Sequence, residues 1–263
     1  MEDYFDGNKL YGDDFSLIEI KKWFEEESEG YANLGSKDRS KYKYPYHNMN
    51  LFYGFNRLPK EYVFSNALGI GSAYGDEFLP ISDRINAITI VEPSDQLVSE
   101  RIGNIIPIYS KPLENGHLNF EKDTFDLITC FGVLHHIPNV SFVLTELKRV
   151  LKPNGFLLIK EPIHTMGDWR NFRKGLTKNE RGIPLNYFTE FIRSNNMVVI
   201  SSSLCDCAFI YRLFGKIIKR DSRMFQMIDS FVARLLKWNY RYHRTRIIHK
   251  LAPATIFLIL SKK

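Results

Sequence analysis

The stretch NALGIGSAYGDE, residues 66–77, decides the fold. An apolar run leads into Gly69-Ile70-Gly71, and a helical pattern follows from Phe78. Glycines at such a junction allow a tight turn and let a ligand approach the backbone, while the next helix offers unpaired N–H groups. The spacing G-x-G-x-x-x-G, with Gly75 as the third glycine, differs from the G-x-G-x-x-G of nicotinamide and flavin sites. The stretch predicts a strand–turn–helix unit, although such a turn can also be purely structural.

Strand and helix patterns alternate on both sides of this turn. Continuous apolar runs predict strands at 62–68, 88–91, 105–109, 125–131, 156–159, 197–202 and 255–260. Apolar residues at helical spacing predict helices at 15–27, 78–85, 140–151 and 184–196, and Ser94 is a plausible N-cap for a further helix at 95–102. Lys152-Pro153-Asn154-Gly155 is expected to end the helix before it. Such alternation favours a parallel sheet that is covered on both faces.

Glu92 follows the second predicted strand and lies 21 residues after Gly71. A carboxylate at this place can accept both ribose hydroxyls of an adenosine bound at the carboxyl edge of the sheet. A lone acid at a strand end is usually only solvated. The prediction of a nucleoside site therefore depends on the combination of Glu92 with the glycine turn.

Residues 62–162 resemble the class I S-adenosylmethionine-dependent methyltransferases, in the branch with small-molecule and glycan-modifying members. The resemblance is carried in order by the glycine turn, IVEPS (90–94), FDLITCFGVLHHIPN (125–139) and LTELKRVLKPNGFLLIKEP (144–162). It implies an α/β fold, namely a Rossmann-like seven-stranded methyltransferase sheet with helices on both faces. The expected segments are an N-terminal helical and aromatic lid (1–60), the core (61–204), a basic helical insertion that caps the substrate side (205–250) and the last strand (251–263).

The resemblance also implies S-adenosyl-L-methionine as cofactor. In the family pattern the methionine part lies against the residues that correspond to Gly69, Ile70, Gly71 and Ser72. Glu92 would hold the ribose hydroxyls and Pro93 would pack near the adenine. The remaining cofactor contacts implied are Glu114 at the adenine amino group, and Cys130 and Phe131 beside the sulfonium and its methyl group.

Two positions depart from the family pattern. Ala67 stands where an acid usually precedes the glycines, which leaves the amino group of the methionine moiety without its common partner. Ala73 replaces the third glycine and is expected to crowd the turn. Asn66, or a residue of the N-terminal segment, could substitute for the missing acid.

Methyl transfer depends mainly on alignment, but an oxygen acceptor must also lose its proton, and a histidine suits that role. The candidates for a general base are His135, His136 and His164, with His47 of the tyrosine-rich lid as a fourth. Each has a structural alternative, because one histidine of an adjacent pair often packs or caps a helix. No zinc spacing is apparent and no metal is expected. Cys205 and Cys207 are interpreted as buried thiols at a strand end.

The excess positive charge is concentrated in one segment. The net charge of the chain is +6, whereas residues 211–250 hold eleven Lys and Arg against two Asp, a local balance of +9. Apolar residues in this segment predict one or two amphipathic helices. The interpretations are a cap over the sheet, or a surface for an anionic membrane, a phosphate, or a nucleotide- or lipid-linked glycan. Nucleic acid is least favoured, because the rest of the chain offers no matching basic patch.

The expected location is cytoplasmic. No apolar run is long enough to span a membrane, the N-terminus is acidic, and three cysteines do not suggest a disulfide framework. The expected function is S-adenosylmethionine-dependent methylation, preferably O-methylation of a saccharide or related small metabolite, as in polysaccharide biosynthesis. The alternatives are an NAD(P)-dependent oxidoreductase that uses the same glycine turn and acid, and a non-catalytic S-adenosylmethionine-binding protein.

Overall fold

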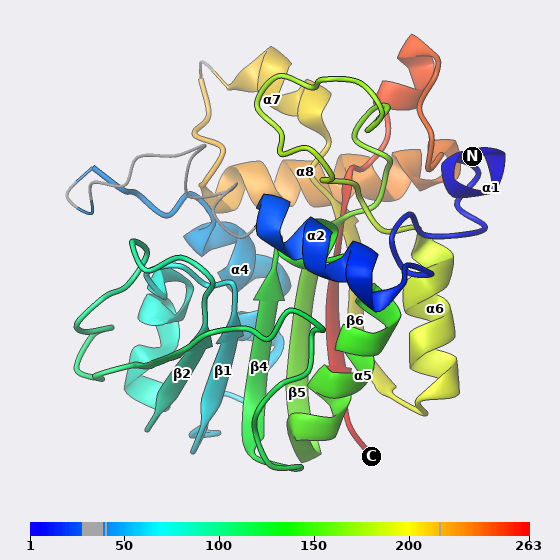
Figure 1. Ribbon diagram of the computed structural model, residues 1–263. Helices are drawn as coiled ribbons and strands as arrows, with labels where there is room; N and C mark the ends of the chain where they lie inside the picture. The colour runs from blue at the N-terminus through cyan, green and yellow to red at the C-terminus, as the bar shows by residue number, and fades with distance from the viewer. Residues whose placement is uncertain (28–38, 40, 216) are drawn as a thin grey trace.

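A computed structural model describes residues 1–27, 39, 41–215 and 217–263. Within this part of the chain, seven strands form one sheet in the order β3-β2-β1-β4-β5-β7-β6 (Figure 1). The predicted Rossmann-like α/β sheet is confirmed. The strands are β1 (Ala67–Ile70), β2 (Ile88–Val91), β3 (Ile108–Ser110), β4 (Phe125–Phe131), β5 (Leu151–Pro162), β6 (Val198–Cys205) and β7 (Thr255–Ser261).

The sheet is mixed, so the prediction of an all-parallel sheet is wrong for its last strand. β1 to β5 pair in parallel, whereas β7 lies between β5 and β6 and is antiparallel to both. The reason is the connection between β6 and β7. The described residues between β6 and β7 stay at the carboxyl edge of the sheet (Figure 1), so β7 starts from that edge and runs in the opposite direction.

Helices cover both faces of the sheet, as predicted. One face packs against α5 (Val140–Val150) and α6 (Leu185–Ser194). The other packs against α4 (His47–Tyr53) and the 3-10 helices η1 (Phe55–Arg57) and η2 (Asp76–Arg84). The remaining helices are α1 (Glu2–Phe5), α2 (Leu17–Glu27), η3 (Leu134–His136), α7 (Ala208–Phe214), α8 (Arg223–Leu236), η4 (Lys237–Asn239) and η5 (Ile247–Lys250).

Three local predictions need correction. Residues 95–102 do not form a helix; side chains bond this backbone locally, since the Ser94 hydroxyl accepts the N–H of Gln96 and the Tyr109 hydroxyl accepts that of Ser99. The segment after the glycine turn is a 3-10 helix that contains Pro80. β1 begins at Ala67, so residues 62–66 of the predicted strand precede it, and of these only Phe64 forms an isolated bridge.

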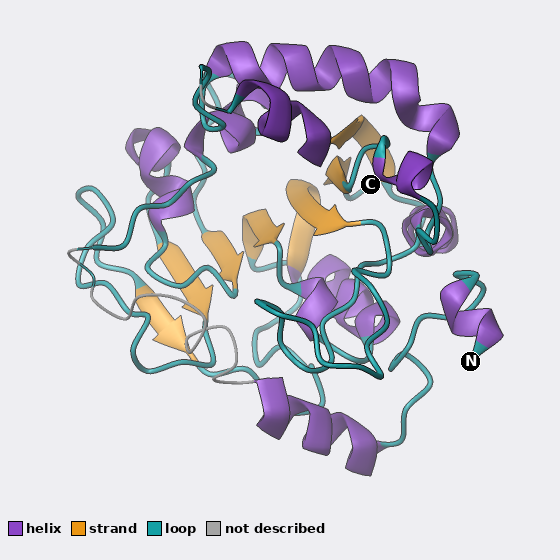
Figure 2. Ribbon diagram, turned by 90° about the horizontal axis from the view of Figure 1, so that it is seen from above, coloured by secondary structure: helices purple, strands orange, loops and turns teal. Residues whose placement is uncertain are grey.

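Three helices outside the core lie at the carboxyl edge of the sheet. α2 crosses one side of this edge, and α7 and α8 lie above the other (Figures 1 and 2). The tyrosine-rich stretch 42–55 has no helix up to residue 46, and α4 begins at His47. Among the described helices, none combines the length and the apolar character needed to cross a bilayer.

Candidate functional site

The glycine turn has a conformation and a packing that require glycine. Gly71 has a φ of +56°, and a Cβ at this position would lie 2.8 Å from Cγ2 of Val133. Gly75 has a φ of +73°, and its Cβ would lie 2.2 Å from Cδ1 of Ile102. Ala73, where the family pattern has glycine, adopts a φ of +48°, a region in which a non-glycine residue is strained. The predicted crowding of the turn therefore takes the form of backbone strain.

A cavity of about 300 Å³ lies at the carboxyl ends of β1, β2 and β4. Gly71 and Glu92 contribute to its floor, and residues 42–46 line it from the N-terminal segment. An adjoining cavity of about 120 Å³ continues toward Glu114. We call these two cavities together the groove. The residues that line both of its parts are Glu27, Gly71, Pro93, Val133 and His136.

The carboxylate of Glu92 is buried and fixed in the groove. Its Oε2 accepts the N–H of Ala73 at 2.9 Å, and its Oε1 accepts that of Ser94 at 3.1 Å. A carboxylate has about four lone-pair positions, and these two bonds fix its orientation. An acceptor held in this way beside a glycine turn is suited to a pair of vicinal hydroxyls.

The other predicted cofactor residues fall into two groups. Ser72 and Phe131 line the larger part of the groove, and Ile70 and Glu114 line the smaller part, where Glu114 Oε2 lies 3.5 Å from the Nζ of Lys21. Gly69 and Cys130 do not appear in the lining formed by the described residues. Gly69 instead gives space to the Ser72 side chain, and Cys130 is fully buried in β4.

Two acids line the groove that sequence reasoning had not singled out. Glu77 is 3% exposed, and its Oε1 accepts hydrogen bonds from the hydroxyls of Ser72 and Thr129. Burial raises the pKa of Glu77. Glu27, the last residue of α2, reaches the groove from the N-terminal segment. Asn66 cannot take the place of the missing acid, because it lies at the opposite end of β1 and its backbone N–H donates to Asp126.

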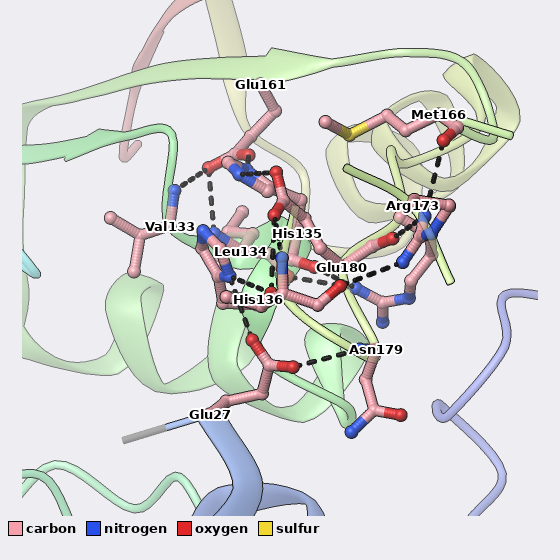
Figure 3. A network of polar contacts seen from close by, with 12 residues as sticks. Glu27, Val133, Leu134, His135, His136, Glu161, Met166, Arg173, Asn179 and Glu180 are labelled. Carbon is pink, nitrogen blue, oxygen red and sulfur yellow. Dashed lines mark hydrogen bonds and ion pairs between the residues drawn. The ribbon is translucent and has the colours of Figure 1, made fainter. Parts of the chain in front are cut away.

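His135 is the centre of a buried ion-pair network (Figure 3). Its Nδ1 lies 2.7 Å from Oε2 of Glu161, and its Nε2 lies 3.5 Å from Oε1 of Glu180. Burial alone would lower its pKa, but the two carboxylates outweigh burial and raise the pKa to about 9. His135 is therefore charged at neutral pH and uses both ring nitrogens in ion pairs, which makes it unsuited to accept a proton.

His136 has the opposite electrostatics. Burial, followed by the charge of the neighbouring His135, lowers its pKa below the ordinary value of 6.5. Its Nδ1 lies 3.1 Å from Oε2 of Glu27 and 3.3 Å from the Thr177 hydroxyl. A neutral imidazole held by a carboxylate is the state that a general base requires.

Donor atoms of His135, His136 and Glu180 come within 4.8 Å of one another, an arrangement that could hold a cation. A protonated imidazole cannot act as a ligand, however, and His135 is held in that form by Glu161 and Glu180. The donor set therefore fits an ion-pair network better than a metal centre.

The other two candidate histidines lie outside the groove. His164 accepts the backbone N–H of Met166 through Nδ1, and burial lowers its pKa to about 3. His47 begins α4 and packs its ring against Tyr44. Neither residue is among the described residues that line the groove.

A further cavity of about 420 Å³, which we call the second cavity, adjoins the groove. The two share Tyr46, Phe131, Gly132 and His136. Lys160 of β5 also lines it, with Nζ 3.7 Å from the centroid of the Tyr46 ring. Burial lowers the pKa of Lys160 to about 8. The sequence analysis did not single out this residue, although a lysine that directly follows the apolar residues of a buried strand indicates a buried charge.

The two cysteines expected to be structural are buried. Cys205 ends β6 and Cys207 precedes α7. Burial raises the pKa of both thiols well above the ordinary value. Both are therefore protonated at neutral pH, in agreement with a packing role.

Comparison with known proteins agrees with this geometry. Residues 68–159 match the family model Methyltransf_11, described as a methyltransferase domain. A sterol 4-C-methyltransferase of Caenorhabditis elegans is 29% identical over 108 residues, covering 38% of this chain and 32% of that protein. A ubiquinone biosynthesis O-methyltransferase of Pasteurella multocida is 37% identical over 49 residues, or 19% of this chain and 20% of that one. The matched part of the chain thus spans a third or less of these curated relatives.

Solved structures share the fold at low sequence identity. A chain in the complex of the Haloferax volcanii Trm112 methyltransferase activator with a methyltransferase superposes with a TM-score of 0.55 and 15% identity, covering 92% of this chain and 97% of that chain. An S-adenosylmethionine-dependent methyltransferase from Mesorhizobium loti superposes with a TM-score of 0.51 and 12% identity, covering 79% of this chain and 94% of that chain. The fold is thus the Rossmann-like methyltransferase fold, and residues 68–159 match the model of a methyltransferase domain.

Proposed function

We propose that the protein transfers a methyl group from S-adenosylmethionine to an oxygen atom of a small-molecule acceptor. The observation that carries this proposal is the Glu92 carboxylate, fixed by two backbone donors beside the Gly71 turn. The cofactor supplies a methyl group on a sulfonium, which is already a good leaving group. The protein therefore contributes mainly binding, alignment and removal of the acceptor proton.

In this proposal the groove binds the cofactor. Glu92 accepts the ribose hydroxyls, Pro93 packs beside the adenine, and Glu114 lies toward the adenine amino group. The backbone of residues 69–72 contacts the methionine part, and Phe131 borders the methyl group, with Cys130 packed behind it. Either Glu77 or Glu27 supplies the carboxylate that Ala67 lacks, because both line the groove.

The second cavity binds the acceptor, and His136 is the general base. His136 is supported over His135 and His164 because it lines both the groove and the second cavity and has a lowered pKa. The imidazole would take the hydroxyl proton while the methyl group passes to the acceptor oxygen, its bond to the sulfonium sulfur breaks and S-adenosylhomocysteine is left. Glu27 orients the ring and stabilises the resulting positive charge.

We further propose a saccharide or related polar metabolite as the acceptor. The polar lining of the second cavity, which includes Lys160, Glu180 and Asp206, supports a hydroxyl-rich molecule more than an apolar one. The ammonium of Lys160 is suited to hold an anionic or hydroxyl oxygen of the acceptor. Because the pKa of Lys160 is about 8, most of this ammonium remains charged at pH 7.

The test compares the binding of S-adenosylhomocysteine with that of NADH by calorimetric titration. We expect S-adenosylhomocysteine to bind and NADH to give no heat, since the glycine spacing departs from the nicotinamide pattern. Mass spectrometry then follows S-adenosylhomocysteine formation with a panel of sugars and nucleotide sugars. Binding of NADH alone would favour the oxidoreductase alternative. Binding of S-adenosylhomocysteine with no turnover on any acceptor would favour a non-catalytic binding protein.

A further inference from the structure

α8 has apolar side chains on two opposite faces. One face is buried, with Phe225 and Ala233 in a cluster that includes Cys207 and Ile210 of the α7 region. The other face is exposed. It consists of Met224 (55% exposed), Met227 (56%), Phe231 (64%), Leu235 (57%) and, just beyond the helix in η4, Trp238 (68%). We call these residues the α8 stripe.

The α8 stripe is continuous along the helix. Its members follow one another at intervals of three or four residues, so at 3.6 residues per turn they fall within about a quarter of the helix circumference. Figure 2 shows α8 along the outer edge of the molecule, with the rest of the chain on one side of it. Contiguous apolar surface of this kind on a folded protein marks an interaction site.

The surroundings of the α8 stripe are positively charged. Among the described residues of 211–250, the exposed basic ones are Arg212, Lys219, Arg223, Arg234, Lys237, Arg241, Arg246 and Lys250. The acids described in 211–250 are not exposed: Asp221 accepts the N–H of Asn48, and Asp229 is buried beneath the turn into α7. Arg223 and Arg234 of α8, and Lys237 at its C-cap, lie along one flank of the stripe by helical spacing.

We propose that the α8 stripe and its basic flank bind the surface of a bilayer that contains anionic phospholipids, with α8 parallel to the membrane plane. An apolar helix face inserts at the boundary between headgroups and acyl chains, while lysine and arginine contact lipid phosphates. Tryptophan is favoured at this boundary, because its indole has both an apolar surface and an N–H donor. The stripe ends in Trp238.

Two other occupants fit the surface less well. A second copy of the chain packed through a two-fold axis would bring basic flanks together, and the described part of 211–250 has no exposed acid to pair with them. Nucleic acid would use the basic residues but would leave the apolar stripe in water. A bilayer with anionic lipids satisfies both features at once.

Docking through α8 would bring the second cavity near the membrane. Asp206 lines that cavity, and its backbone N–H donates to Asp229 of α8 at 2.8 Å. An acceptor carried on a lipid would then reach the cavity without leaving the bilayer surface. This consequence rests on the proposed function, whereas the membrane binding itself does not.

The tryptophans of the chain provide the measurement. Trp238 is exposed, whereas Trp23 and Trp169 are buried, so insertion of the α8 stripe changes mainly the emission of Trp238. The full chain is titrated with vesicles of phosphatidylcholine alone, and with vesicles in which one lipid in four is phosphatidylglycerol. With the anionic vesicles we expect a blue shift, weakened by salt, and quenching by lipids with brominated acyl chains.

Surface variants separate the apolar and the charged contributions. The double variant Phe231→Ser/Leu235→Ser should lower the partition coefficient at least roughly tenfold. The double variant Arg234→Glu/Lys237→Glu should lower the partition coefficient to a similar extent with the anionic vesicles, and should leave it unchanged with phosphatidylcholine alone. Phe142→Ser, at a partly exposed phenylalanine of α5 on the other face of the sheet, is the matched control and should bind as the parent does. Circular dichroism checks that each variant is folded.

Several results would overturn the proposal. Absence of a shift and of quenching with the anionic vesicles would exclude membrane insertion, as would unchanged binding by Phe231→Ser/Leu235→Ser. A blue shift that grows with protein concentration in the absence of lipid would assign the stripe to a second copy of the chain. Salt-sensitive binding of a DNA duplex, without any lipid quenching of Trp238, would assign the basic residues to nucleic acid.

Discussion

Glu27 and His136 lie 109 positions apart in the sequence, and Oε2 of Glu27 is 3.1 Å from Nδ1 of His136. The other oxygen of the same carboxylate accepts the N–H of Asn179 at 2.9 Å. One side chain of the N-terminal segment thus joins the loop after β4 to the loop before α6. In the proposed mechanism, Glu27 at the end of α2 therefore orients the general base His136.

The first prediction concerns His136 as general base. His136→Asn should lower the rate of methyl transfer by about 10² to 10⁴-fold, the usual contribution of a general base, with little change in affinity for S-adenosylhomocysteine. Because burial and His135 lower the pKa of His136, the neutral form dominates at pH 7. The rate should be level above pH 6.5 and fall as pH decreases below it.

A pH–rate profile measured under single-turnover conditions checks this prediction. His117→Asn is the matched control, because His117 is an exposed histidine paired with Glu146 on the surface. Its profile should equal that of the parent. A rate that rises through pH 8 to 9 would instead point to Lys160, whose pKa is about 8.

The second prediction concerns the stability provided by His135. The carboxylates of Glu161 and Glu180 raise its folded-state pKa to about 9 from an unfolded value of 6.5. The stabilisation is therefore fully present below pH 6.5 and is lost as pH rises through 9. It amounts to at most about 3 kcal/mol at 1.36 kcal/mol per pH unit.

Urea unfolding of the parent and of His135→Gln between pH 6 and 10 measures the stabilisation that the charged form of His135 provides. The difference in unfolding free energy should be largest near pH 6 and should shrink toward pH 10. A difference that does not depend on pH would mean that His135 is neutral in the folded protein.

The third prediction concerns Glu92. Glu92→Ala should weaken S-adenosylhomocysteine binding by roughly 2 to 4 kcal/mol, since two charge-assisted hydrogen bonds are lost. Glu92→Gln keeps one carbonyl acceptor and should lose less. Asp95→Ala, at an exposed acid three residues away, is the control and should bind normally. Equal affinities for Glu92→Ala and the parent by calorimetry would remove Glu92 from the site.

The fourth prediction uses two glycines with similar backbones. Gly71 and Gly175 have φ values of +56° and +78°, but a Cβ at Gly71 would meet Val133, whereas one at Gly175 meets nothing within 4 Å. Both alanine variants carry a left-handed backbone cost of about 1 to 2 kcal/mol. Only Gly71→Ala should also reduce cofactor affinity, by at least roughly tenfold. Denaturation and calorimetry on both variants measure the two effects, and equal affinities would show that the close packing at Gly71 is unimportant.

The central strands were predictable because their burial is visible in the residues themselves. The runs ITIV and FDLITCF were assigned to 88–91 and 125–131, the bounds of β2 and β4, since strands covered on both faces are continuously apolar. The helix expected at 95–102 does not form; the hydroxyls of Ser94 and Tyr109 accept the N–H groups of Gln96 and Ser99 instead, and helical spacing carries no information about such bonds.

The candidate site was predictable where its residues are local and unpredictable where they meet across the chain. Gly71 and Glu92 follow consecutive strands, so topology alone brings them together. The charge of His135 depends on Glu180, which is 45 positions away, and nothing in the pair HH indicates which ring is protonated. Glu77 was missed because an acid after a glycine turn is usually solvated, and its burial results from tertiary packing.

The most direct test of the account is a crystal structure of the protein with S-adenosylhomocysteine. The account predicts adenosine in the groove, with both ribose hydroxyls donating to the carboxylate of Glu92 and the adenine between Pro93 and Glu114. A nucleoside bound elsewhere, or a groove filled by the side chains of residues 42–46, would contradict it.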